Sequence, residues 1–196
     1  TATIDRRFSR GIWRADARAV VAAAPEGTTG AVWEIPLAGA PQPRNTAGIG
    51  VGDLELAPDG ALVFIGTEAL RPPELYIVRP GSATPERLTD WHASIAALTL
   101  GKVESMSWAS DDRLPLTGIL TFPPNFAPTQ RYPLLLNIHG GPWGSSREVF
   151  NTRNQLLAGK GFIVFEPNYR GSDNYGNALY SAVYRDHGAG PGRDIM

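Results

Sequence analysis

The chain contains no cysteine, and its three histidines are far apart in the sequence. The lack of cysteine excludes disulfides, thiolate metal sites and a cysteine nucleophile. None of the histidines (His92, His139 and His187) forms a motif with the short spacing that zinc ligands usually have. We therefore expect no metal and no other cofactor.

Long hydrophobic runs and an excess of one charge are also missing. No segment reaches the roughly 18 uninterrupted apolar residues of a membrane-spanning helix, so no span is expected. The 18 basic and 19 acidic side chains give a formal net charge of −1, which argues against nucleic acid or an anionic membrane surface as the main partner. The first residues, TATIDRRFSRG, lack the apolar core of a signal peptide, and the choice between cytoplasm and periplasm stays open.

Residues 15–40 and 58–83 resemble each other when the chain is shifted by 43 positions. The shift superposes Asp16 on Asp59, Val20 on Val63, Trp33 on Tyr76 and Ile35 on Val78. Each unit reads as a turn, a short apolar strand, a Gly/Pro-rich loop and a strand around an aromatic residue. A period near 43 is typical of the four-stranded blades of a β-propeller. Two similar hairpins in a β-sandwich are the alternative.

From about Val103 the pattern changes to that of a mixed α/β sheet. Residues 103–110 and 114–122 are expected to form an antiparallel pair of strands. Residues 133–139 are almost wholly apolar and predict a strand buried on both faces, as in a parallel sheet. A helix over 147–158 and a strand at 162–167 then complete a βαβ unit. The helix is expected from a stripe of Val149, Phe150, Leu156 and Leu157.

These patterns predict two domains. Residues 1–100 are expected to be about two C-terminal blades of a β-propeller, and residues 101–196 the N-terminal half of an α/β-hydrolase domain. Because at least about three repeats are needed for a stable stack, the propeller prediction requires further blades outside these residues.

The buried strand at 133–139 ends in His139-Gly140-Gly141-Pro142. In open α/β sheets, ligands bind beyond the carboxyl ends of the strands. Glycines at such a corner let the backbone turn sharply and approach a ligand, so that amide hydrogens can face a negative oxygen. In α/β-hydrolases the loop after the third strand supplies one oxyanion donor in this way. A plain tight turn is the alternative.

Three stretches of the chain resemble the catalytic domain of the prolyl oligopeptidase family of serine peptidases: PLLLNIHGGPWGSS, LAGKGFIVFEPNYRGSDNYG and YRDHGAGPGRDIM. The resemblance is greatest to the acylaminoacyl-peptidase and dipeptidyl-peptidase-like branch, which carries His-Gly-Gly-Pro and Asn-x-Arg-Gly-Ser. It covers about residues 132–196. The repeat upstream agrees with it, because these enzymes place a β-propeller before an α/β-hydrolase domain.

The resemblance implies roles for a few residues. The second glycine of the motif, Gly141, would give its backbone N–H to the oxyanion. Related branches use a tyrosine at the position of His139, which makes His139 a second candidate in this loop, expected mainly to brace it. Trp143 is a candidate for lining the substrate pocket. Arg170 and Ser172 match an Arg-Gly-Ser element, which we interpret as structural, with Arg170 paired to backbone or carboxylate.

No Gly-x-Ser-x-Gly motif occurs in the chain. Asp186-His187 stands where the family usually has Asp-Trp-Gly, so this pair is not expected to be catalytic. The resemblance places the nucleophilic serine, the aspartate and the histidine beyond Met196, on the remainder of the same polypeptide. We expect this fragment to supply the oxyanion-hole loop of a serine peptidase that cleaves short peptides through an acyl-enzyme, and to be inactive alone.

Two other functions remain open at this stage. One is a carboxylesterase of the same fold, against which a propeller argues. The other is a non-catalytic binding module built on propeller strands. An unpaired sheet edge, where a further strand would lie, is expected to promote association, so a homo-oligomer is also open.

Overall fold

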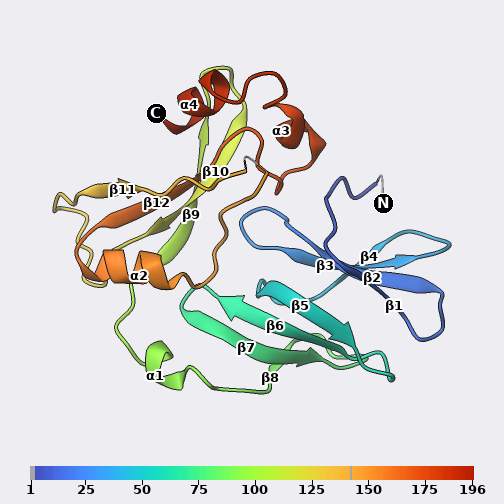
Figure 1. Ribbon diagram of the computed structural model, residues 1–196. Coiled ribbons are helices and arrows are strands. Elements are labelled where there is room, and N and C mark those ends of the chain that lie inside the picture. The colour runs from blue at the N-terminus through green and yellow to red at the C-terminus, as the bar shows by residue number, and fades with distance from the viewer. Residues whose placement is uncertain (1–2, 142) are drawn as a thin grey trace.

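The computed structural model describes residues 3–141 and 143–196, which form three four-stranded sheets and four short helices (Figure 1). The first sheet contains β1 (Gly11–Trp13), β2 (Ala19–Ala24), β3 (Ala31–Pro36) and β4 (Gln42–Arg44). The second contains β5 (Gly50–Leu56), β6 (Leu62–Glu68), β7 (Arg71–Val78) and β8 (Glu86–Arg87). The third contains β9 (Val103–Ala109), β10 (Pro115–Thr121), β11 (Leu134–Leu136) and β12 (Ile163–Asn168). The helices are α1 (Ala93–Ala96), α2 (Thr152–Gly159), α3 (Asn177–Ser181) and α4 (Ala189–Ile195).

The first two sheets are antiparallel, and in each the strands lie side by side in chain order. Equivalent positions of the sequence repeat also form equivalent turns. The Asp16 carboxylate accepts a hydrogen bond from the amide of Arg18, and the Asp59 carboxylate accepts one from the amide of Ala61. The intervening residues, Ala17 and Gly60, both have a positive φ. The repeat therefore extends to backbone conformation.

One hydrophobic core joins these two sheets and shows where the repeat fails. Val21 on β2 and Phe64 on β6 are both buried in it, as the 43-residue shift predicts. On the next strand, however, the core residues are Val32 in the first sheet and Tyr76 in the second, which are 44 positions apart. Trp33 therefore lies outside this core although the shift superposes it on Tyr76, because a slip of one residue moves a side chain to the opposite face of a strand.

The third sheet is mixed, with the strand order β11-β12-β10-β9. Strands β9, β10 and β12 pair antiparallel, whereas β11 runs parallel to β12 and α2 lies in the connection between them. The predicted strand–helix–strand unit is therefore present. None of the helices formed by the described residues is long and apolar enough to cross a bilayer.

Several expectations about the details of this unit were wrong. The strand expected over 133–139 is shorter, and its leucines at 134 and 136 are exposed because β11 lies at the edge of the sheet. The helix expected to begin at 147 begins at Thr152, where the Asn151 side chain caps it by accepting from the amide of Asn154 at 3.2 Å.

The face that α2 buries is also different from the expected apolar stripe. Asn154, Gln155 and Ala158 are buried, whereas Leu156 is 68% exposed. Gln155 forms two hydrogen bonds with the backbone of Gly101, accepting from its amide at 2.8 Å and donating to its carbonyl at 2.9 Å. Hydrogen bonding to a neighbouring segment therefore orients this helix.

Candidate active site

The loop from His139 to Ser146 follows β11 and is held at both ends by residues that follow or end β12. The Tyr169 hydroxyl donates to the carbonyl of His139 at 2.6 Å. The fully buried side chain of Asn168 accepts from the amide of Ser146 at 2.7 Å and donates to its carbonyl at 2.9 Å. We call the described residues of this segment, 139–141 and 143–146, the 139–146 loop; Pro142 lies outside the described residues.

Gly141 sits at the exposed corner of this loop with φ 129°. A Cβ atom built there would lie 2.6 Å from the backbone nitrogen of Trp143, so glycine is required by both conformation and space. Among the described residues, none accepts a hydrogen bond from the Gly141 amide. The neighbouring Gly140 has open space around its Cβ position and no positive φ.

His139 is half-buried and fixed by its neighbours. Its ring stacks on that of Tyr169, with centroids 4.5 Å apart, and its Nε2 lies 3.0 Å from the hydroxyl oxygen of Ser172. Burial lowers the pKa of His139 below its ordinary value, against the raising effects of the Gly140 carbonyl and the Asp173 carboxylate. The imidazole is thus packed between the 139–146 loop and the turn after β12.

Ser172 and His139 do not form a nucleophile–base pair. Ser172 is 0% exposed, and its hydroxyl donates to the carbonyl of Tyr169 at 2.7 Å. On the other side of the ring, Nδ1 of His139 lies 3.3 Å from the carbonyl oxygen of Gly140, so the imidazole contacts the loop backbone as well as Ser172. A serine with no exposed surface cannot attack a substrate, so we interpret this contact as structural.

Arg170 anchors the turn after β12. Its guanidinium donates to both carboxylate oxygens of the buried Asp194 on α4 at 2.8 Å, and to Asp112 at 2.9 and 3.0 Å. Hydrogen bonds to Asp194 and then to Asp112 raise the pKa of Arg170, and the same contact lowers the pKa of Asp112 to about 2. The expected pairing of Arg170 with carboxylates is therefore present.

Trp143 is an exposed residue of the 139–146 loop, whereas Asp186, of the Asp186-His187 pair, contacts the start of α4. Trp143 is 52% exposed, and its ring stacks on that of Tyr180, with centroids 5.5 Å apart. The Asp186 carboxylate accepts from the amide of Gly190 at 2.8 Å and thereby binds the first turn of α4. Asp186 is thus engaged in a structural contact.

Asn168 and Tyr169 were missed as loop-positioning residues by the sequence interpretation. The available signal was their place directly before Arg170 in the Asn-x-Arg-Gly-Ser element. Their partners in the 139–146 loop, Ser146 and His139, lie 22 and 30 positions upstream, so no pattern within the element itself shows these contacts.

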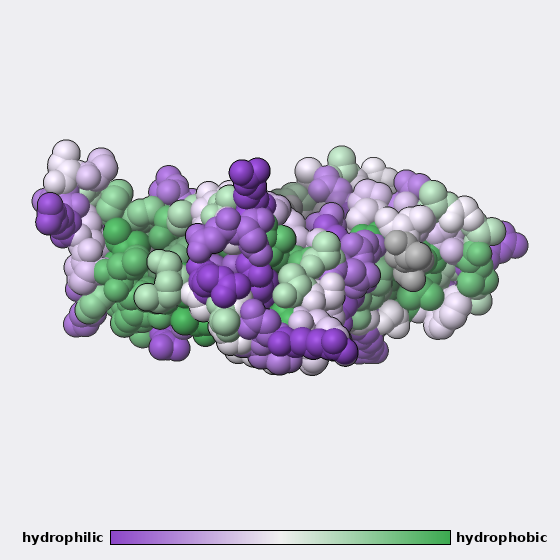
Figure 2. Space-filling view, turned by 90° about the horizontal axis from the view of Figure 1, so that it is seen from above, coloured by the Kyte–Doolittle hydropathy of each residue, from purple (hydrophilic) through white to green (hydrophobic). Residues whose placement is uncertain are grey.

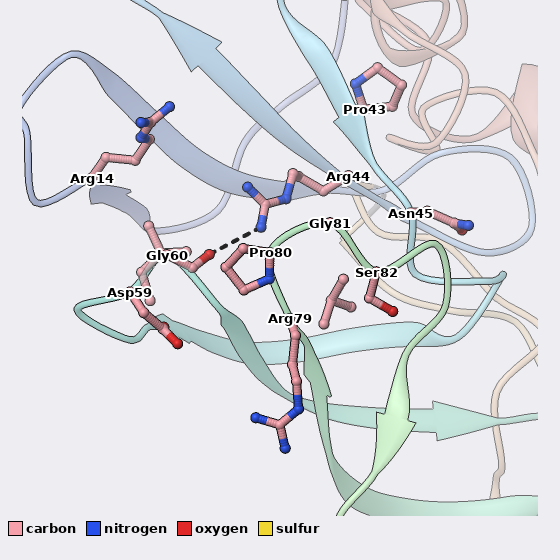
Figure 3. Close-up of a pocket in the computed structure, with 12 residues that line it drawn as sticks. Arg14, Pro43, Arg44, Asn45, Asp59, Gly60, Arg79, Pro80, Gly81 and Ser82 are labelled. Carbon is pink, nitrogen blue, oxygen red and sulfur yellow. Dashed lines mark hydrogen bonds between the residues drawn. The ribbon is translucent and has the colours of Figure 1, made fainter.

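A pocket of about 450 Å³ lies at the strand ends of the first two sheets (Figure 3). It carries three arginines, and each is paired: Arg14 and Arg44 with Glu34, and Arg79 with Glu86. Arg44 also donates to the carbonyl of Gly60 at 3.2 Å, as the dashed line shows. Since its lining comes wholly from the first two sheets and their turns, this pocket is separate from the 139–146 loop.

Comparison with known proteins gives concordant matches. The model of the prolyl oligopeptidase family matches residues 148–196. Uncharacterized peptidase YuxL of Bacillus subtilis is 30% identical over 189 residues, which are 95% of this chain and 29% of that protein. Dipeptidyl-peptidase 5 of Aspergillus oryzae is 28% identical over 130 residues, 55% of this chain and 18% of that protein. The chain thus spans less than a third of the length of these curated relatives.

Solved structures agree on the fold. Acylaminoacyl peptidase of Pyrococcus horikoshii matches with a TM-score of 0.84 and 24% identity, over 98% of this chain and 30% of that one. Dipeptidyl peptidase 4 of Porphyromonas gingivalis matches with a TM-score of 0.76 and 19% identity, over 95% of this chain and 28% of that one. The family match of residues 148–196, the relatives and the fold agree with the resemblance of this chain to the prolyl oligopeptidase family.

Proposed function

We propose that this chain is part of a serine peptidase that hydrolyses short peptides of the acylaminoacyl or dipeptidyl type through an acyl-enzyme. The names of its relatives and of the proteins that share its fold support this substrate class. In this proposal residues 1–100 are the last two or so blades of a propeller, and residues 101–196 are the first half of the hydrolase domain.

One observation carries the proposed role of the 139–146 loop. The Gly141 amide lies beyond the carboxyl end of a strand that is parallel to its neighbour, in an exposed corner, with no acceptor among the described residues. A negative carbonyl oxygen is the partner that such a donor would stabilise in acyl transfer. His139 braces the loop from inside, and Trp143 forms one side of the pocket for the substrate.

The nucleophile, its base and the base's aspartate come from the remainder of the polypeptide. The exposed edge of β11 is the place where that remainder would add a strand. Leu134, Leu136 and Ile138 are exposed there, and hydrophobic surface gathers at the end of the molecule where Figure 1 places β11 (Figure 2). The serine would attack the peptide carbonyl, the Gly141 amide would stabilise the oxyanion, and the histidine would relay the proton.

Two glycine substitutions test this role in a longer polypeptide, which has the length of the relatives and contains these 196 residues. Gly141→Ala should lower kcat for a short peptide by about 100-fold, because the residue can no longer hold its amide in place and one oxyanion donor is worth 10²–10³. Gly140→Ala is the matched control and should stay within about threefold, since its Cβ meets no atom within 4 Å.

The same assay separates the alternatives. An equal kcat for Gly141→Ala and the parent would show that the Gly141 amide does not stabilise the oxyanion. Turnover of simple esters with no turnover of peptides would favour a carboxylesterase. Absence of any turnover by the longer polypeptide would favour a binding module. The 196-residue chain by itself should hydrolyse neither class, because acyl transfer needs an activated nucleophile.

A further inference from the structure

The segment that leads into β1 runs against α3, on the other half of the molecule (Figure 1). Both carboxylate oxygens of Asp5 lie 3.1 Å from the amide of Asn177, the first residue of α3. Gly176 passes directly beneath: a Cβ built there would lie 2.2 Å from Asp5 Oδ2. Only glycine permits this approach, so the leading segment and the start of α3 are fitted closely to each other.

Arg7 makes a second contact with the same helix. Its Nη1 donates to the Tyr180 hydroxyl at 2.7 Å, and its guanidinium carbon lies 5.0 Å from the centre of the Tyr180 ring. A hydrogen bond and a cation–π contact to one side chain restrict both its position and the orientation of its ring. Arg7 thereby orients an aromatic side chain that belongs to the other half of the molecule.

Tyr180 carries this contact on to the 139–146 loop. Its ring stacks on Trp143, with an interplanar angle of 19°. Trp143 is two positions from Gly141, between the loop ends that Tyr169 and Asn168 fix. Across the middle of the loop, the carbonyl of Gly144 also accepts from the amide of Asp173 at 3.2 Å. The stack is therefore the contact through which the leading segment reaches the exposed corner.

We propose that Arg7 is a positioning residue that holds Trp143 through Tyr180 and so keeps the Gly141 corner in place. This inference rests on the proposed function of that corner. It makes the segment before β1 part of the support of the substrate site, although Arg7 touches neither substrate nor reacting atoms.

The first experiment needs no activity. The five tryptophans give five indole N–H resonances in the NMR spectrum of the 196-residue chain, and Trp143→Phe identifies that of Trp143. Arg7→Ala should move this resonance toward its unstacked position and remove the Tyr180–Trp143 cross-peak. Arg7→Lys should largely restore both, since an ammonium also donates to the hydroxyl and attracts the ring. Arg10→Ala, a surface change in the same segment that removes a pair with Glu55, should change neither.

The second experiment measures peptide hydrolysis by the longer polypeptide. Arg7→Ala should lower kcat about fivefold with little change in KM, and Arg7→Lys should recover most of it, as expected when one exposed cation–π contact is lost. An unchanged Trp143 resonance in Arg7→Ala overturns the inference whether or not the protein is a peptidase. A moved resonance with an unchanged kcat in an active polypeptide overturns it too. A longer polypeptide without peptidase activity refutes the proposed function, while the NMR experiment still tests the contact.

Discussion

At the scale of single residues, the buried carboxylate of Glu74 has a structural role that its sequence context does not suggest. Glu74 on β7 is 1% exposed. It accepts hydrogen bonds from the Thr89 hydroxyl and from the amides of Trp91 and His92. Burial by itself would raise the pKa of Glu74, but these hydrogen bonds outweigh it and lower the pKa to about 2. One side chain thus binds the linker that joins the second sheet to the third.

Replacing Glu74 by glutamine should therefore destabilise the chain in a pH-dependent way. At pH 7 we expect a loss of about 2 kcal/mol in the free energy of unfolding, because one anionic acceptor oxygen becomes an NH₂ group that faces donors. A carboxyl whose folded pKa is lowered stabilises the fold above its ordinary pKa. That contribution is lost as the pH falls from about 4.5 through about 2.

Urea unfolding of the parent and of Glu74→Gln at a series of pH values measures this difference. Glu55→Gln, at an exposed surface pair, is the control and should change stability by less than about 0.5 kcal/mol. A Glu74→Gln variant as stable as the parent at pH 7, or a difference that does not shrink in acid, would show that the linker is held in another way.

At the scale of secondary-structure elements, α2 shows that a polar contact can decide which face of a helix is buried. The leucine at position 156 is exposed, while Gln155 satisfies the amide and the carbonyl of Gly101. Position 101 must be a glycine, because a Cβ atom there would lie 1.9 Å from the carbonyl oxygen of Phe122. The three segments meet too closely for any larger residue.

We expect Gln155→Ala to lower the free energy of unfolding by about 2 kcal/mol, because two buried backbone groups lose their partners. Leu156→Ala, the neighbouring change, should cost less than about 0.5 kcal/mol since that side chain is in water. Thermal and urea unfolding of the two variants compare them directly. A larger loss of unfolding free energy for Leu156→Ala than for Gln155→Ala would show that α2 buries the apolar stripe expected from the sequence.

At the scale of the whole molecule, the exposed edge at β11 is the feature with the clearest consequence. Leu134 is 61% exposed, and Leu136 and Ile138 are also exposed. Unpaired strand edges with apolar side chains pair readily with other chains. The 196-residue chain should therefore self-associate as its concentration rises.

Lysine at the edge should suppress this association, because a charge on an edge strand opposes pairing. In sedimentation velocity runs, Leu134→Lys should raise the concentration at which the chain associates by at least tenfold. This corresponds to a free-energy change of about 1.4 kcal/mol. Leu37→Lys, at another exposed leucine on a turn of the first sheet, is the control. Association that Leu134→Lys does not weaken would place the contact on another face.

Much of this molecule follows from short-range patterns in the sequence. The turns at Asp16 and Asp59, the strands of the repeat, the βαβ unit and the match of residues 148–196 to the prolyl oligopeptidase family could all be predicted. These features depend on neighbouring residues, whose backbone preferences and alternation are visible in the chain itself. The position of Gly141 after a strand belongs to the same class.

Which faces are buried, and which distant segments meet, was decided only by tertiary structure. The one-residue slip that separates Trp33 from Tyr76, the exposure of β11 and the polar face of α2 each depend on what packs against the element. The contacts of Arg7 with Tyr180 and of Arg170 with Asp112 join residues 173 and 58 positions apart. No local pattern encodes such pairs, because burial and partners arise when separate segments share one volume.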